Sequence, residues 1–276
     1  MSAFQPDAII HTAAERRPDV VEKDPDASHA LNVDVPAHLA RLCAQLEPTP
    51  LLINISTDYV FDGTKPPYKV DDAPNPLNAY GVSKLEGEMA VAKHGKHGSA
   101  TNVRVPVLYG RTAPGQNSES AVNVLLDAVQ PPADAAQQHK KKKMDACAVR
   151  YPTNVEDVAR VLADLVQKYV ASRGASSSAD ADAAVFDVPP ILHFSATEAM
   201  TKYDMSNIFT RLTHAAGGEA SMDHLEPEYE IDPLAATSRP KHCKLDVSVL
   251  QGLGISTDFV PFEDWWRAYI AEVRRA

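Results

Sequence analysis

No glycine precedes Gly63 in this chain of 276 residues, although the chain holds 12 glycines in all. Glycine-rich turns let backbone N–H groups approach a bound phosphate closely, at the start of a helix. The residues before Gly63 therefore contain no sequence for such a turn. A ligand that depends on a glycine-rich phosphate loop is not expected to be held by this part of the chain.

The sequence is also poor in cysteine and in positive charge. Its three cysteines are odd in number and far apart, which favours a reducing compartment over a disulfide framework. A net charge of −10 argues against binding to nucleic acid or to an anionic membrane. No Cys/His cluster has the spacing of a metal site, so we predict no metal.

Long apolar runs are absent as well. No stretch approaches the ~18 apolar residues of a membrane-spanning helix. The first residues, "MSAFQPDAII", have neither the basic region nor the apolar run of a signal peptide. These features predict a soluble, cytoplasmic protein.

Apolar segments typical of buried strands alternate with helical segments along the first half of the chain. The strand candidates are "DAIIHT", "LLINIST" and "TNVRVPVLYG". Between them, apolar residues recur at helical spacing over residues 24–46, and Asn78 is placed as the N-cap of a helix over residues 79–93. This alternation predicts an α/β fold with a parallel sheet.

The stretch "NAYGVSKLEGE" places Tyr80 and Lys84 four residues apart, on one face of the predicted helix. A nearby ammonium favours the phenolate and would lower the pKa of Tyr80, which suits a proton donor to a carbonyl oxygen. Ser56 and Thr57 end a predicted strand, at the edge of a parallel sheet where ligands bind. A Tyr-x-x-x-Lys pair alone is a weak signal, but the ordered combination is more specific.

Several segments carry a resemblance to a known family: "HTAAERRPDVVEKDPDASHALNVD", "ISTDYVFDGTKPPY", "PLNAYGVSKLEGE", "VRVPVLYG", "RYPTNVEDVA" and "MTKYDM". In this order they resemble an extended short-chain dehydrogenase/reductase of the dTDP-4-dehydrorhamnose reductase branch. Within that branch the chain is most similar to the regulatory beta subunits of methionine adenosyltransferase. "AAERRPDVVE" is the segment most specific to that group.

The resemblance implies a Rossmann-like parallel sheet with a small C-terminal substrate-binding lobe. A single domain is expected over residues 1–276. Within it, residues 110–155 and 196–262 would form the lobe. Thr57, Tyr80 and Lys84 would be the catalytic residues, with Ser56 beside them. Other roles implied by the resemblance are cofactor binding by His11, Thr12, Ala13, Ala14, Tyr80, Lys84, Val105, Pro106 and Val107, and binding of a substrate diphosphate by Arg239.

The cofactor implied by the resemblance is NADP or NAD, but the family's first strand and glycine-rich turn have no counterpart in this sequence. We therefore expect an N-terminally truncated sheet that lacks its first βαβ units and leaves "DAIIHT" as an apolar edge. Weak binding of NAD(P), or none, is expected in consequence. Catalysis by this chain alone is not expected.

Three functions remain open from the sequence. The first is a regulatory, non-catalytic subunit of methionine adenosyltransferase in S-adenosylmethionine biosynthesis, whose partner is the catalytic subunit. The second is an NAD(P)-dependent nucleotide-sugar reductase similar to dTDP-4-dehydrorhamnose reductase. The third is an inactive fragment that folds poorly.

Overall fold

A computed structural model describes residues 4–132, 141–175, 186–230 and 238–275. The chain divides into two compact units. The first unit comprises Met1–Val105, Val158–Phe194 and Ala236–Thr257, and the second comprises Pro106–Asp157, Ser195–Ala235 and Asp258–Ala276. The substrate-binding role expected of residues 110–155 and 196–262 stays a prediction.

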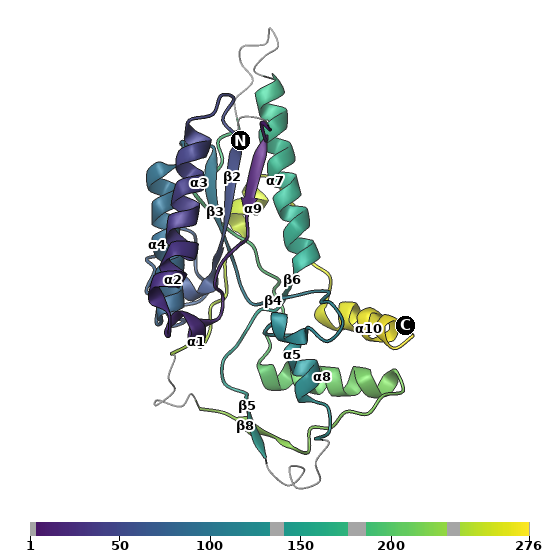
Figure 1. Ribbon diagram of the computed structural model, residues 1–276. Coiled ribbons are helices and arrows are strands. Elements are labelled where there is room, and N and C mark those ends of the chain that lie inside the picture. Colours follow the sequence, from purple (N-terminus) through teal and green to yellow (C-terminus); the bar gives the residue numbers. More distant parts are fainter. Residues whose placement is uncertain (1–3, 133–140, 176–185, 231–237, 276) are drawn as a thin grey trace. The chain divides into compact units, whose positions relative to one another are not determined.

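A parallel sheet forms the centre of the first unit (Figure 1). Its strands, in spatial order, are β1 (Ala8–His11), β2 (Leu51–Thr57), β3 (Ala100–Val105) and β7 (Ile191–His193). The prediction of an α/β fold with a parallel sheet is confirmed. β1 lies at an edge of this sheet, and the side chain of Ile10 on it is 44% exposed.

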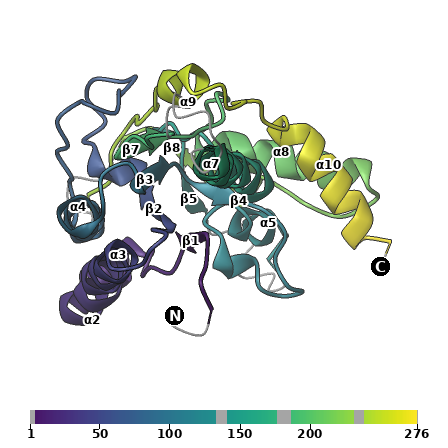
Figure 2. The same cartoon turned by 90° about the horizontal axis from the view of Figure 1, so that it is seen from above.

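Helices cover both faces of this sheet (Figure 2). The first face carries α2 (Pro25–His29), α3 (Val35–Ala44) and α4 (Ala79–His94), whereas α7 (Val155–Ala175) and α9 (Ser248–Gly252) lie on the opposite face. The short helices α1 (Pro18–Val21) and η2 (Asp58–Val60) complete the unit. Apolar packing on the first face joins Ala40 and Cys43 of α3, Leu52 of β2 and Val91 of α4.

The helix predicted over residues 24–46 is interrupted by a π-helical turn, η1 (Ala30–Asp34). Pro36 has no backbone N–H and cannot donate to the carbonyl four residues earlier. At this point the N–H of Val35 donates instead to the carbonyl of Ala30, five residues earlier. The single predicted helix is therefore two helices, α2 and α3, joined by a wider turn.

Helix α4 begins as predicted, with Asn78 as its N-cap. The Asn78 side chain accepts a hydrogen bond from the N–H of Gly81 at 2.9 Å, and Glu22 accepts one from the N–H of Ala79 at 3.0 Å. Both contacts satisfy backbone donors that have no partner inside the helix. The N-terminal end of α4 is thus fixed by its own cap and by a carboxylate from the segment after α1.

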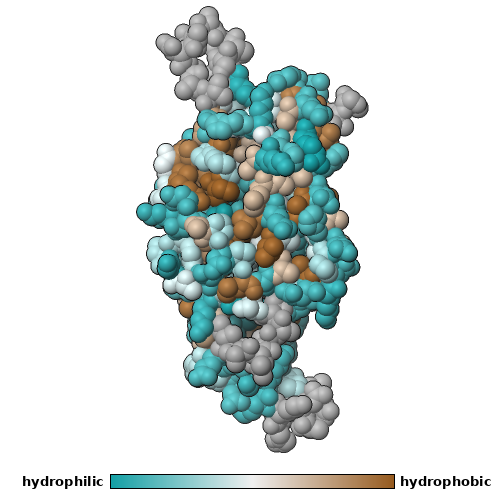
Figure 3. All heavy atoms as spheres, turned by 90° about the vertical axis from the view of Figure 1, so that its left-hand side faces the viewer, coloured by the Kyte–Doolittle hydropathy of each residue, from teal (hydrophilic) through white to brown (hydrophobic). Residues whose placement is uncertain are grey.

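Helix α4 buries polar side chains and exposes apolar ones. Lys84 and Glu88 are only 3% and 2% exposed, whereas Val82 and Met89 are 41% and 63% exposed. Figure 3 views the side of the molecule that carries α2 to α4, where apolar side chains interrupt a hydrophilic surface. The contacts that attach this helix to the sheet are therefore partly polar, beside the apolar contact of Val91.

The second unit has its own apolar core, in which aromatic rings dominate. Tyr109 stacks on Trp266 with ring centroids 5.6 Å apart, and the ring of Phe209 meets Trp266 edge-on at 4.6 Å. The elements around this core are β4 (Leu108–Tyr109), β5 (Lys142–Asp145), β6 (Thr153–Asn154), β8 (Leu225–Glu228), η3 (Asn117–Glu119), α5 (Val124–Ala128), α8 (Lys202–Ala215) and α10 (Phe262–Val273). β4 pairs with β6 and β5 with β8, both in parallel.

Among the described residues, no helix combines the length and the apolar character needed to cross a bilayer.

Gly87 lets α4 approach η1 closely, and this contact can be tested. A Cβ atom at Gly87 would lie 2.2 Å from the carbonyl oxygen of Asn32. Alanine normally stabilises a helix relative to glycine. Here we expect Gly87→Ala to lower the free energy of unfolding by about 1–3 kcal/mol, because the two backbones must separate.

The matched control is Gly252→Ala in α9, where an added Cβ meets no atom within 4 Å. This variant should be as stable as wild type or slightly more stable. Urea denaturation of the three proteins measures the difference. Equal stability of Gly87→Ala and wild type would show that the α4–η1 contact is not tight.

Candidate functional site

The predicted catalytic residues meet where β2 ends and α4 begins. Thr57 is the last residue of β2, and Tyr80 and Lys84 lie in the first turns of α4. The Tyr80 hydroxyl shares a hydrogen bond with the Thr57 side chain. The Lys84 ammonium donates to the carbonyl of Ile55 at 2.7 Å, two residues before Thr57. The structure therefore brings these three residues together, and their catalytic role stays a prediction.

Burial governs the acidity of Tyr80. Removal of its hydroxyl from water raises the pKa well above the ordinary value for tyrosine, and the negative charge of Asp58 acts in the same direction. The hydrogen bond to Thr57 and the positive charge of Arg16 oppose this shift in the pKa. The expectation that Lys84 lowers the pKa of Tyr80 is wrong here, since desolvation outweighs the favourable contacts.

Lys84 is shifted toward its neutral form. Burial lowers the pKa of Lys84 to about 8, while the negative charge of Glu88 acts in the opposite direction. With a pKa of about 8, both the ammonium and the amine are populated between pH 7 and 9. The charge of this site therefore changes close to physiological pH.

His11 ends β1 beside this cluster. It is 8% exposed, and burial together with the positive charge of Lys84 lowers its pKa. Its Nε2 atom is buried and has no hydrogen-bond partner among the described residues. Thr12 and Ala13 follow it and are exposed, and Ala14 is partly buried. These residues form the strip expected to contact an adenosine.

The remaining predicted residues are placed as follows. Val105 ends β3 and is 4% exposed. Pro106 and Val107 belong to the second unit, and Val107 packs against the core of that unit. Their contact with a nicotinamide stays a prediction.

Arg239 is paired inside the first unit. Its guanidinium lies 3.3 Å from the carboxylate of Asp19 on α1. The carbonyl of the preceding residue, Ser238, accepts a hydrogen bond from the Asn78 side chain at 2.8 Å. The segment of Arg239 is thus attached to the start of α4, and its binding of a diphosphate stays a prediction.

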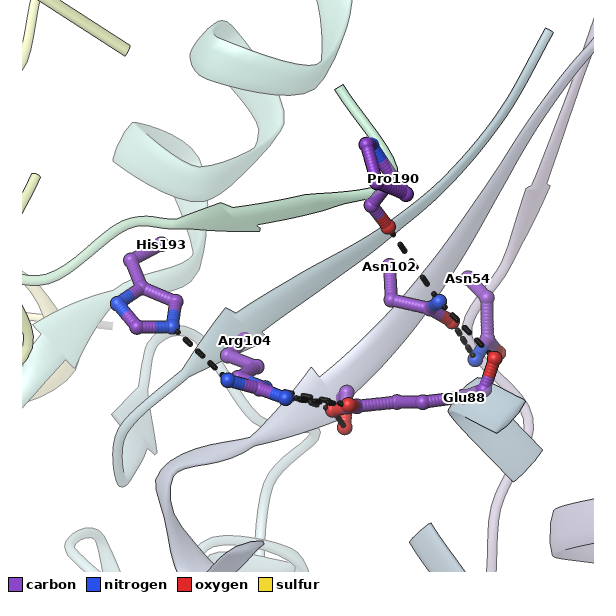
Figure 4. A network of polar contacts seen from close by, with 7 residues as sticks. Asn54, Glu88, Asn102, Arg104, Pro190 and His193 are labelled. Atoms are coloured by element: carbon purple, nitrogen blue, oxygen red, sulfur yellow. Dashed lines mark hydrogen bonds and ion pairs between the residues drawn. The ribbon is translucent and has the colours of Figure 1, made fainter. Parts of the chain in front are cut away.

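A buried ion pair that the sequence analysis did not predict joins Glu88 of α4 to Arg104 of β3 (Figure 4). The Glu88 carboxylate accepts hydrogen bonds from Arg104 of β3, at 2.9 Å from Nε and 2.7 Å from Nη2. It also accepts one from the hydroxyl of Ser56. Arg104 in turn lies 3.4 Å from Nε2 of His193, whose pKa is lowered to about 4, by burial first and by the Arg104 charge second.

These residues belong to two polar rows that cross the sheet. Ser56, Arg104 and His193 are adjacent in register on β2, β3 and β7. His11, Asn54 and Asn102 are adjacent in the same way on β1, β2 and β3. The Asn54 side chain donates to that of Asn102 at 2.8 Å (Figure 4). The sequence carries a sign of these rows in the segments "NIS" (residues 54–56) and "NVR" (residues 102–104). In each segment two polar residues stand two positions apart, which is the spacing of side chains on one face of a strand.

Asn32 in η1 attaches the segment after β1 to α4. Its side chain accepts from the N–H of Glu15 at 2.9 Å and donates to the carbonyl of the same residue at 3.1 Å. It also donates to the hydroxyl of Ser83 on α4 at 3.0 Å. Asn32 is only 1% exposed, so these bonds form in a dry environment.

In the part of the chain that the structure describes, no group of His, Cys, Asp or Glu residues could hold a metal ion.

Comparison with known proteins identifies the relatives of this chain. The family model described as "RmlD substrate binding domain" matches residues 1–274. Methionine adenosyltransferase 2 subunit beta of Danio rerio is 39% identical over 264 residues, which cover 96% of this chain and 72% of that protein. The Bos taurus protein of the same name is 41% identical over 91% of this chain. The match spans 66% of the bovine protein's length.

Solved structures with the same fold include dTDP-4-dehydrorhamnose reductases. The enzyme from Clostridium acetobutylicum superposes with a TM-score of 0.74 at 23% identity, covering 99% of this chain and 83% of its own. The enzyme from Bacillus anthracis, solved in complex with NADP, gives a TM-score of 0.73 at 22% identity, with 98% and 81% covered. At identities this low, the superpositions show only that the fold is shared. The shared fold confirms the prediction of a Rossmann-like parallel sheet.

The low pKa of Lys84 makes the stability of the protein depend on pH. Folded Lys84 loses its proton near pH 8, whereas in the unfolded chain it does so near 10.5. Between these values the unfolded chain binds more protons, so stability from this residue rises with pH. From pH 8 to 9.5 we expect wild type to gain about 1.5 kcal/mol in the free energy of unfolding relative to Lys84→Met.

Urea denaturation at both pH values measures this gain. Lys93→Met, at an exposed position in the last turn of α4, is the control and should follow wild type. Parallel pH profiles for wild type and Lys84→Met would contradict the shifted pKa.

Proposed function

Because this chain belongs to the RmlD substrate binding domain family, we propose that it is a regulatory, non-catalytic subunit of methionine adenosyltransferase. Its role would lie in S-adenosylmethionine biosynthesis, and its partner would be the catalytic subunit of that enzyme. The observation that carries the proposal is 39% identity to the Danio rerio protein over 96% of the chain.

The state of the candidate site supports a non-catalytic role. A general acid works best when its pKa lies near the working pH. The pKa of Tyr80 is instead raised far above neutrality by burial, and Lys84 donates to the Ile55 carbonyl at 2.7 Å. In this arrangement both side chains hold α4 to the end of β2, which a binding protein requires as much as an enzyme does.

We propose further that the same site takes NADP or NAD. Thr57, Tyr80 and Lys84 would face the nicotinamide, and the strip from His11 to Ala14 would face the adenosine. The buried Nε2 of His11, which has no partner among the described residues, supports a polar ligand at this place. Such a nucleotide supplies or accepts a hydride when bound, and in a regulatory subunit its binding would stabilise the fold. The weak affinity expected from the sequence stays a prediction, which calorimetric titration with both nucleotides checks.

If the role is recognition, partner binding depends on a folded surface and not on a proton donor. We therefore expect the double variant Tyr80→Phe, Lys84→Met to bind the catalytic subunit of methionine adenosyltransferase within about 0.5 kcal/mol of wild type. Co-purification followed by a binding titration of both proteins measures this. Lys93→Met, in the last turn of the same helix, is the surface control.

Two results would change the assignment. A wild-type chain that is folded by circular dichroism but does not bind the catalytic subunit would refute the regulatory role. Binding that is lost only in the double variant would place the Tyr80–Lys84 site inside the interface with the partner.

The second candidate function is a nucleotide-sugar reductase that acts on a 4-dehydro sugar. The meeting of Thr57, Tyr80 and Lys84 at one end of the sheet favours it. In this role Tyr80 would donate a proton to the carbonyl oxygen of the sugar, and Lys84 and Thr57 would orient the phenol. Arg239 would contact the diphosphate of the substrate.

We expect no oxidation of NADPH by the chain with dTDP-4-dehydrorhamnose, measured by absorbance. If turnover is found, Tyr80→Phe should reduce it by about 10²–10⁴-fold, because the phenylalanine keeps the ring and lacks the proton donor. Turnover that Tyr80→Phe leaves unchanged would show that Tyr80 is structural and that the activity arises elsewhere.

A further inference from the structure

We propose that Glu88 is a positioning residue for the candidate site: it anchors α4 to the end of β2 beside Lys84 and Thr57, and its negative charge favours the ammonium form of Lys84. A contribution of Glu88 to holding a nucleotide rests on the function proposed above. The effect of Glu88 on Lys84 does not depend on that function.

Lys84 and Glu88 are one helical turn apart, so their side chains leave the same face of α4. Lys84 donates to the carbonyl of Ile55, and Glu88 accepts from the hydroxyl of Ser56. These are consecutive residues of β2, and Thr57 follows them directly. The two side chains of α4 thus anchor the helix to the end of the strand that carries Thr57.

Arg104 fixes the Glu88 carboxylate from the other side. Its Nε and Nη2 donate to the two carboxylate oxygens at 2.9 Å and 2.7 Å, and the side chains of the pair are 4% and 3% exposed. A fork of two parallel hydrogen bonds defines both the place and the orientation of a carboxylate. Glu88 is therefore held in one place by β2 and β3 together.

A buried ion pair is by itself weak evidence of a gain in stability. Well-packed apolar side chains of similar volume usually stabilise a core as well as such a pair does. Here the pair replaces apolar packing next to a lysine whose charge depends on its surroundings. The arrangement is accounted for if the carboxylate serves that lysine.

The charged groups around Lys84 come from three elements. Glu88 on α4 favours the ammonium, and Tyr80 lies one turn before Lys84 on the same helix. His11 on β1 interacts with the Lys84 charge, and burial keeps the pKa of His11 low. Arg104 on β3 contacts the far side of the Glu88 carboxylate. Glu88 is thus the acidic side chain that acts on Lys84 among the described residues.

Nitrogen-15 NMR of the lysine side chains tests the proposal, with the Lys84 signal assigned by its loss in Lys84→Met. In Glu88→Gln we expect the midpoint of the Lys84 titration to fall by about one pH unit. This corresponds to about tenfold less ammonium relative to amine at a given pH. Glu86→Gln, which removes a half-exposed carboxylate from the same helix, should leave the midpoint unchanged.

Glu88→Gln leaves Arg104 without its partner and could unfold the protein. The double variant Glu88→Gln, Arg104→Met removes both charges, and the same downward shift is expected. An unchanged Lys84 midpoint in a folded variant overturns the proposal, as does unfolding of both variants, which would assign the pair to the fold alone. The measurement needs neither nucleotide nor partner, so its failure is distinct from failure of the proposed function.

Discussion

The ion pair between Glu88 and Arg104 determines how the first unit is assembled. It lies between α4 and the middle of the sheet, with 2.7 Å between the charged atoms. Water cannot replace either partner at this depth, and breaking such a pair typically costs about 3–5 kcal/mol. Directional bonds therefore help to set the position of α4, in addition to the apolar packing that places most helices.

This docking also decides the chemistry available at the end of β2. The same burial that makes the polar contacts strong raises the pKa of Tyr80 and lowers that of Lys84. The two shifts leave a neutral phenol beside a lysine that is only partly charged. A phenol whose pKa is raised in this way gives up its proton less readily than an exposed tyrosine does.

The sequence predicted the sheet because short apolar segments alternate with helical ones, and it predicted the start of α4 because Asn78 is a strong N-cap. It did not predict the polar rows, since "LLINIST" was read as one apolar run and the alternation of Asn54 and Ser56 within it was overlooked. The break at η1 depends on a single residue, Pro36, inside a helical pattern. The pKa of Tyr80 could not be predicted at all, because it depends on burial created by residues distant in the sequence.

The bonds of Asn32 have a consequence for the segment after β1. Asn32 accepts from the backbone N–H of Glu15 and donates to its carbonyl, which are groups that every residue except proline also offers. These two bonds would therefore remain after a substitution of Glu15 by any residue other than proline. The Glu15 side chain is engaged separately, by the backbone N–H and the guanidinium of Arg17. A buried amide thus holds the chain at this point independently of the side chain that the position presents to solvent.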